Sequence, residues 1–161
     1  MLICCLYARL GDPAALMWPR LNRNEVRQAL AISGAWLALW TGGSIAASVL
    51  TGHWITYAHG TALVTAFLIF GPAGEEMLFR GLVFQRARQL WPATAAPAIY
   101  LSTVAFSLHH IAINAAPHEL ATAQILFTLP LGIVLATLRE RTGSLWPGLL
   151  VHMATNFPAA L

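Results

Sequence analysis

Three charged side chains stand in the middle of one of the most apolar stretches of this sequence. No charged residue occurs from Gln28 to Gly74, and then Glu75, Glu76 and Arg80 follow within six residues. In a lipid bilayer, each ionised group near the centre costs about 2.5–3.5 kcal/mol on insertion scales. Side chains four apart share a helix face, so Glu76 can pair with Arg80, whereas Glu75 is rotated away by about 100°. We therefore interpret Glu76–Arg80 as a structural ion pair and Glu75 as the carboxylate available for chemistry.

The composition is typical of an integral membrane protein. Of the 161 residues, 58% are hydrophobic and 9% are charged, whereas soluble proteins average about 25% charged residues. The nine basic residues are all arginine and the net charge is only +3. Because these arginines lie mainly at the ends of apolar segments, we expect a bilayer as partner and no nucleic acid.

The lengths of the apolar segments predict an all-α fold, a polytopic transmembrane bundle of about five spans. A helix needs about 20 apolar residues to cross the hydrocarbon core. Residues 1–27 are expected to form a cytoplasmic or interfacial lead, whose short apolar start suggests truncation of a longer chain. Residues 28–57 are expected to form the first span and its loop, and residues 58–161 a transmembrane domain that contains the remaining spans. The five predicted spans are 28–50, 61–85, 98–116, 120–138 and 145–161.

The arginines also predict the orientation of the chain. They occur in the lead, after the second span and after the fourth span, and the intervening loops contain none. By the positive-inside rule, the N-terminus lies in the cytoplasm and the C-terminus outside. A small chain rich in alanine and arginine is typical of bacteria, so we expect the bacterial plasma membrane.

Polar side chains recur at a similar depth in three of the predicted spans. Glu75 lies 11 residues from Arg86, and His152 lies 11 residues from Arg141. At 1.5 Å per residue both side chains are about 16 Å from the cytoplasmic edge, and His110 is at about 20 Å. We therefore expect the three side chains to meet.

A carboxylate, two imidazoles and a carboxamide at one depth form a set that can hydrolyse a peptide bond. Glu75 can take a proton from water and return it to a leaving amine. His110 can hold or polarise that water, and His152 and Asn156 can donate hydrogen bonds to a tetrahedral oxyanion. Glu75, His110 and His152 could instead hold zinc or another divalent metal. The sequence does not decide between these two arrangements.

Other interpretations of the same residues stay open. Intramembrane histidine and asparagine often only join helices, which is the interpretation we favour for His109, since it lies off the helix face of His110. We expect His53, His59 and His118 in loops. Two functions of another class also fit: a non-catalytic membrane immunity or binding protein of the same fold, and a carrier of ions or metals.

Three motifs, taken together and in order, resemble the CPBP family. This family is also called CAAX protease and bacteriocin-processing, or Abi, and includes the type II CAAX prenyl endopeptidases. Its pattern is Glu-Glu-x-x-x-Arg, Phe-x-x-x-His and His-x-x-x-Asn or Asp, which stands here at 75–80, 106–110 and 152–156. The approach to the third motif at 141–147 is similar as well, and the resemblance covers about 58–161.

The resemblance implies an intramembrane endopeptidase. In this reading Glu75 and His110 activate water, while His152 and Asn156 stabilise the oxyanion. Its substrates would be membrane peptides or proteins with prenylated or CAAX-like ends, or bacteriocin-type peptides. Members are named metalloproteases, but a metal-independent mechanism is also proposed for them. We expect no cofactor to be required, because these four side chains fill the roles without one.

Overall fold

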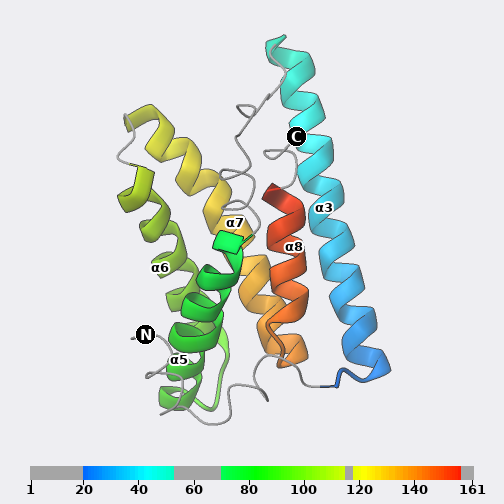
Figure 1. The fold of residues 1–161 in the computed structure, drawn as a ribbon, viewed down its shortest axis with the longest axis vertical. Helices are drawn as coiled ribbons and strands as arrows, with labels where there is room; N and C mark the ends of the chain where they lie inside the picture. Colours follow the sequence, from blue (N-terminus) through cyan, green and yellow to red (C-terminus); the bar gives the residue numbers. More distant parts are fainter. Residues whose placement is uncertain (1–19, 53–69, 115–117, 157–161) are drawn as a thin grey trace.

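The computed structural model describes residues 20–52, 70–114 and 118–156, and all the regular elements in these ranges are helical (Figure 1). The all-α prediction is therefore confirmed. Residues 70–76 are helical and lead directly into a π-helix. The named elements are α3 (Arg23–Thr51), the π-helix η1 (Met77–Val83), α5 (Phe84–Leu90), α6 (Ala96–Asn114), α7 (His118–Thr142) and α8 (Trp146–Asn156).

Helix α3 begins earlier than the predicted start at residue 28. The side chain of Asn22 accepts a hydrogen bond from the backbone N–H of Glu25 at 3.0 Å, and the Glu25 carboxylate accepts one from the Asn22 N–H at 2.8 Å. This reciprocal capping box satisfies two N–H groups that the first turn would otherwise leave unpaired. The helix therefore extends into the charged lead.

Helix α7 lies at the centre of the described bundle. It packs against α6, α8 and α3, and its side chains Leu131, Leu135 and Leu138 are almost fully buried. Gly132 faces α6: a Cβ built there would lie 2.9 Å from Thr103 Cγ2. Glycine at this position thus lets the two antiparallel helices approach closely, as small residues do between membrane helices.

The π-helix η1 connects the glutamates to α5 without a loop. Its last wide turn closes with a hydrogen bond from the backbone N–H of Phe84 to the carbonyl of Phe79, which spans five residues. The hydroxyl of Ser102 on α6 donates to the same carbonyl at 3.0 Å. Phe79, Arg80 and Gly81 are consecutive and all buried. The π-helix therefore brings the arginine of the first motif into the interior.

The remaining helices lie close to their predicted spans but differ at their ends. The second span was expected to end at residue 85, and α5 continues to Leu90. The fourth was expected to end at residue 138, and α7 continues to Thr142, after which Gly143 adopts a left-handed φ of 63°. Glycine favours this conformation after a helix end. Residues 61–69 of the second predicted span, 115–116 of the third and 157–161 of the fifth lie outside the described residues, as does most of the loop predicted between the first two spans.

One helix in the described part of the chain, over Arg23–Leu50, is long and apolar enough to cross a membrane. Helix α8 has 11 described residues, or about 16 Å of helix. The count of five spans therefore stays a prediction.

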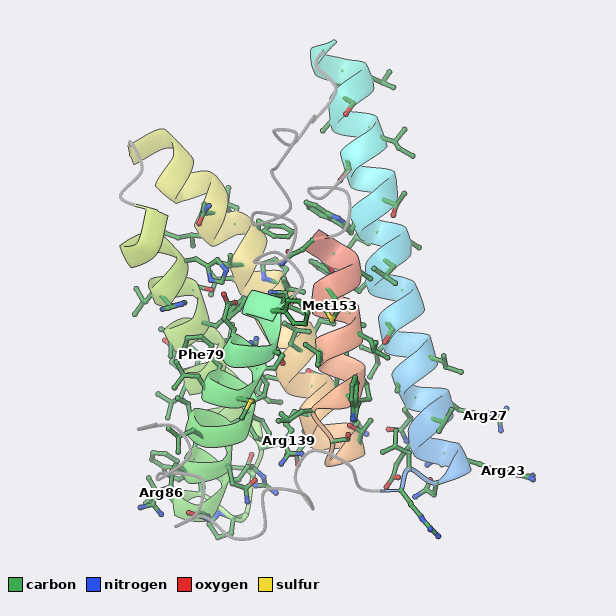
Figure 2. The ribbon with its side chains drawn as sticks, in the orientation of Figure 1. Arg23, Arg27, Phe79, Arg86, Arg139 and Met153 are labelled. Carbon is green, nitrogen blue, oxygen red and sulfur yellow. The ribbon has the colours of Figure 1, made fainter. Side chains whose placement is uncertain are left out.

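The labelled arginines share one end of the bundle. In Figure 2, Arg23, Arg27, Arg86 and Arg139 lie toward the lower end, whereas Phe79 and Met153 lie near the middle. Phe79 belongs to the first motif and Met153 to the third, so these two motifs lie near mid-height, away from the arginine-bearing end.

Candidate active site

The first motif contains a fully buried ion pair. Arg80 Nη1 donates to Glu76 Oε1 at 3.0 Å, and the exposed fractions of the two side chains are 0% and 2%. Arg80 Nη2 also donates to the carbonyl of Gly132 on α7 at 3.2 Å. The guanidinium lies 4.3 Å from the centre of the Phe106 ring on α6, a cation–π contact. One arginine therefore joins the glutamate helix to both α6 and α7.

Glu76 has a second partner, which the sequence interpretation did not include. Its Oε1 lies 3.0 Å from Nδ1 of His152 on α8, and the His152 side chain is 2% exposed. An ionised carboxylate can only accept a hydrogen bond, so beside Arg80 it holds the proton of His152 on Nδ1. In a neutral imidazole this leaves a lone pair on Nε2, which lies 3.7 Å from Glu75 Oε2.

His110 is oriented in the same way by its own helix. Its Nδ1 lies 2.9 Å from the backbone carbonyl of Phe106. A carbonyl oxygen only accepts, so Nδ1 carries the hydrogen and Nε2 carries the lone pair. This Nε2 lies 3.8 Å from Glu75 Oε2. The Phe106 ring meets the rings of His110 and His152 edge-on, with centroid distances of 4.4 and 5.5 Å.

The structure thus brings together the three side chains expected to meet from their depth in the sequence. Glu75, His110 and His152 come from the helical segment 70–76, α6 and α8. The side chains of Glu75 and His110 are 21% and 23% exposed, whereas those of Glu76, Arg80 and His152 are buried. Glu75 and His110 are thus partly exposed side chains next to the buried Glu76, Arg80 and His152, and Oε2 of Glu75, which faces both imidazoles, is itself buried and has no hydrogen-bond partner among the described residues.

Asn156 and His109 occupy less central positions. Asn156 is the last residue of α8, one turn beyond His152, and is half-buried. Within the described residues it makes no hydrogen bond to the glutamates or histidines. The ring of His109 lies 5.3 Å from that of Phe79, so it packs between helices. His53 and His59 lie outside the described residues, and His118 is the first residue of α7 rather than a loop residue.

Gly148 provides the space that the Glu76 carboxylate occupies. It lies one turn before His152 on α8, and a Cβ built on it would be 3.1 Å from Glu76 Oε2. Glu76 is held by Arg80 and His152, so it cannot move away freely. The spacing of four between Gly148 and His152 is the signal in the sequence that both share this face of the helix.

We expect Gly148→Ala to lower the free energy of unfolding by about 1–3 kcal/mol, the usual cost of overpacking a filled interior. Gly43→Ala in α3 is the matched control, because no atom lies within 4 Å of the Cβ it would add. Chemical unfolding of both variants would measure the difference. Equal stability of the two variants would contradict the close packing of Glu76 against α8.

The three converging atoms do not fit a metal site as they stand. Zinc with bonds of about 2.0–2.1 Å in a tetrahedron separates its ligand atoms by roughly 3.3 Å, whereas Glu75 Oε2 is 3.7 and 3.8 Å from the two imidazole nitrogens. Among the described residues, no group of three or more His, Cys, Asp or Glu side chains is arranged to hold a metal ion. To hold zinc, Glu75 Oε2 would have to approach the two imidazole nitrogens by roughly 0.4–0.5 Å.

A surface cleft of about 380 Å³ lies away from these residues, between the ends of α5 and α7. It is lined by polar side chains that include Arg88 and Glu140. Arg88 Nε pairs with Glu140 at 3.2 Å, and Nη1 donates to the carbonyls of Trp91 and Pro92. The charges of Arg88 and Glu140 therefore join α5 to α7 and to the turn that follows α5.

Comparison with known proteins identifies a family that the chain matches. Residues 57–158 match the family model described as Rce1-like, type II CAAX prenyl endopeptidase Rce1-like. The match covers more than half of the chain and includes all three motifs. No curated protein and no solved structure matches.

Proposed function

This chain belongs to the Rce1-like type II CAAX prenyl endopeptidase family, which is membrane-embedded, and we propose that it hydrolyses peptide bonds of membrane-associated peptides or proteins. The observation that carries this proposal is the approach of His110 Nε2 and His152 Nε2 to within 3.8 and 3.7 Å of Glu75 Oε2. A partly exposed carboxylate between two oriented imidazoles suits general acid–base chemistry.

Glu75 is the proposed base. A water molecule donates one proton to its carboxylate, and His110 Nε2, which carries a lone pair, accepts the other hydrogen and orients the water. The water oxygen then forms a bond to the peptide carbonyl carbon, and the carbonyl π electrons move to its oxygen. When the C–N bond breaks, Glu75 returns its proton to the leaving amine.

His152 takes up a proton before it stabilises the oxyanion. With Nδ1–H donated to Glu76, a neutral His152 has no hydrogen on Nε2 to offer. The proton that Glu75 takes from water passes to Nε2 and produces an imidazolium, whose positive charge the buried Glu76 offsets. In this form His152 donates to the oxyanion, and the Asn156 amide is the second donor. When the oxyanion collapses, the same proton returns to Glu75, which delivers it to the leaving amine. This mechanism needs no metal.

The proposed setting is a polytopic bundle of about five spans in a bacterial plasma membrane, with the N-terminus in the cytoplasm. The four arginines labelled toward one end of the described bundle in Figure 2 support this orientation. In this setting the buried Glu76–Arg80 pair lies within the hydrocarbon region, where unpaired charges are most costly.

The orientation predicts the outcome of cysteine labelling. In a variant with Cys4 and Cys5 replaced by serine, a cysteine introduced at Arg86, which is exposed, should react with a membrane-impermeant maleimide only from the cytoplasmic side. A cysteine at Gly52, which follows the C-terminal end of α3, should react only from outside. Reversed labelling would contradict the orientation, and labelling of both from one side would contradict the span between them.

The activity itself is tested by cleavage of a peptide library with purified protein in lipid. The library contains prenylated CAAX peptides, their unprenylated counterparts and bacteriocin-type leader peptides, and products are identified by mass spectrometry. Cleavage restricted to prenylated ends would assign the CAAX class, and cleavage of leader peptides would assign peptide maturation. A folded protein that cleaves no member would favour the non-catalytic immunity or binding function.

Chelation distinguishes a metal-independent mechanism, in which Glu75 activates water, from one that uses zinc or another divalent metal. We expect activity to change less than about twofold after treatment with a strong chelator, because Glu75 and the two histidines supply the proton transfers directly. The measurement is the cleavage rate before and after chelation and dialysis. Loss of activity that is restored by added zinc would overturn the metal-independent mechanism.

A further inference from the structure

Helix α3 lies outside the family match at 57–158 and yet reaches the helix that carries the third motif. The indole Nε1 of Trp36 donates a hydrogen bond to Thr155 Oγ1 on α8 at 3.0 Å. Trp36 is 7% exposed and Thr155 is 3% exposed. The Thr155 hydroxyl donates its own hydrogen to the carbonyl of Val151 at 2.8 Å, so its lone pairs are free to accept from the indole. The contact is therefore a buried hydrogen bond in which the indole is the donor and the hydroxyl oxygen is the acceptor.

Thr155 occupies the part of α8 that the proposed chemistry uses. It lies three residues after His152 and directly before Asn156, the last described residue of α8. His152 is held by Glu76, and among the hydrogen bonds of the described residues 153–156 the bond from Trp36 is the one that reaches another helix.

Trp36 is itself held in place by aromatic packing. Its ring stacks on Trp40 of the same helix, with centroids 6.5 Å apart and planes 6° apart. Both rings contact Phe127 of α7, at 6.4 and 4.4 Å. An indole fixed in this way loses little rotational freedom when it forms the hydrogen bond, so the bond can set the position of α8.

We propose that Trp36 is a positioning residue of the active site, which fixes the final turn of α8 through Thr155 and thereby aims His152 and Asn156 at the reacting carbonyl. This inference rests on the proposed function. It makes α3 part of the working site, although the helix carries no motif of the family. Displacement of a catalytic group by about 1 Å can lower the rate by about 10²-fold, so loss of the bond should act on kcat.

The test uses conservative variants in the full chain. Trp36→Phe keeps an aromatic ring and removes the N–H, and Thr155→Val removes the hydroxyl at nearly constant shape. Trp40→Phe is the matched control, because it makes the same ring change in the same aromatic stack but leaves the hydrogen bond from Trp36 to Thr155 in place. We expect each of the first two variants to lower kcat by about 10–100-fold with little change in KM. Trp40→Phe should stay within about twofold of the wild type.

Two further readouts separate positioning from general stability. The double variant Trp36→Phe/Thr155→Val should be no slower than the slower single variant, because both changes remove one bond. Thr155→Ser, which retains a hydroxyl, should recover most of kcat. Equal losses in Trp36→Phe and Trp40→Phe, or fully additive losses in the double variant, would overturn the proposal.

Hydrogen–deuterium exchange tests the Trp36–Thr155 hydrogen bond, the proposed anchor of α8, without an activity assay. Amide exchange in a peptide covering α8 should increase in Trp36→Phe and Thr155→Val but not in Trp40→Phe. Unchanged exchange in the first two variants would refute the anchor even if the protein is an active protease. A wild type that cleaves nothing, combined with the expected exchange pattern, would refute the proposed function and leave the anchor supported.

Discussion

Replacing Glu75 by glutamine is expected to lower kcat by about 10²–10⁴-fold, the usual contribution of a positioned general acid–base. Glutamine has nearly the same shape but cannot take a proton from water at neutral pH. The Glu75 side chain is 21% exposed, and the ion pair of Arg80 is formed with Glu76, so the substitution should leave the fold intact. The measurement is kcat on the best peptide of the library, together with thermal unfolding of the same sample.

Glu140→Gln is the control for this change, because Glu140 is a carboxylate of similar exposure that lies next to Arg139 at the arginine-bearing end of the bundle and is paired with Arg88. It should retain wild-type kcat. If Glu75→Gln remained fully active, Glu75 would not be the base and the mechanism proposed above would fail. If both variants lost activity together, the loss would come from charge or stability and not from proton transfer.

The second large effect is expected for Arg80→Met, which should lower the free energy of unfolding by about 3–5 kcal/mol, as does removal of one partner from a buried ion pair. Methionine fills much of the arginine volume, but it leaves the Glu76 carboxylate without its cation in a site that is 2% exposed. It also removes the donor to the Gly132 carbonyl and the cation–π contact with Phe106. Reversible unfolding in mixed detergent micelles would measure the change.

Arg88→Met is the matched control for Arg80→Met. The Arg88–Glu140 pair has a similar distance of 3.2 Å, but both side chains are 28% exposed, and exposed pairs contribute about 0–1 kcal/mol. Adding Glu76→Gln to Arg80→Met should recover part of the lost stability, because no charge is then left unpaired. Equal effects of Arg80→Met and Arg88→Met would contradict the interior placement of the first pair.

The parts of the site that depend on helical periodicity could be predicted from the sequence. A spacing of four is sufficient to pair Glu76 with Arg80, and equal distances from flanking arginines are sufficient to bring Glu75 and His152 to one depth. The contact between Glu76 and His152 could not be predicted, because it depends on how closely α8 approaches the glutamate helix. That approach is decided by Gly148, whose role emerges only from packing.

For the fold, too, local sequence patterns predict one part and contacts between distant segments decide the other. The all-α class and the approximate helix positions follow from the lengths of the apolar segments. The start of α3 differs because the Asn22–Glu25 capping box extends the helix into charged sequence. The hydrogen bond between Trp36 and Thr155 joins residues 119 apart in the chain, and the local sequence around neither residue predicts it.

The π-helix between the glutamates and α5 makes the effect of a deletion depend on where in the chain it falls. A π turn holds more residues than an α turn, so loss of a single residue from Met77–Val83 would let the segment wind as an ordinary α-helix. The shorter α-helix covers nearly the same rotation, so α5 would keep its direction relative to Glu75 and Glu76. A one-codon deletion in Phe84–Leu90 has no wide turn to absorb it and would rotate the arginine-bearing end of α5 by about 100°, while every residue of the three motifs is retained.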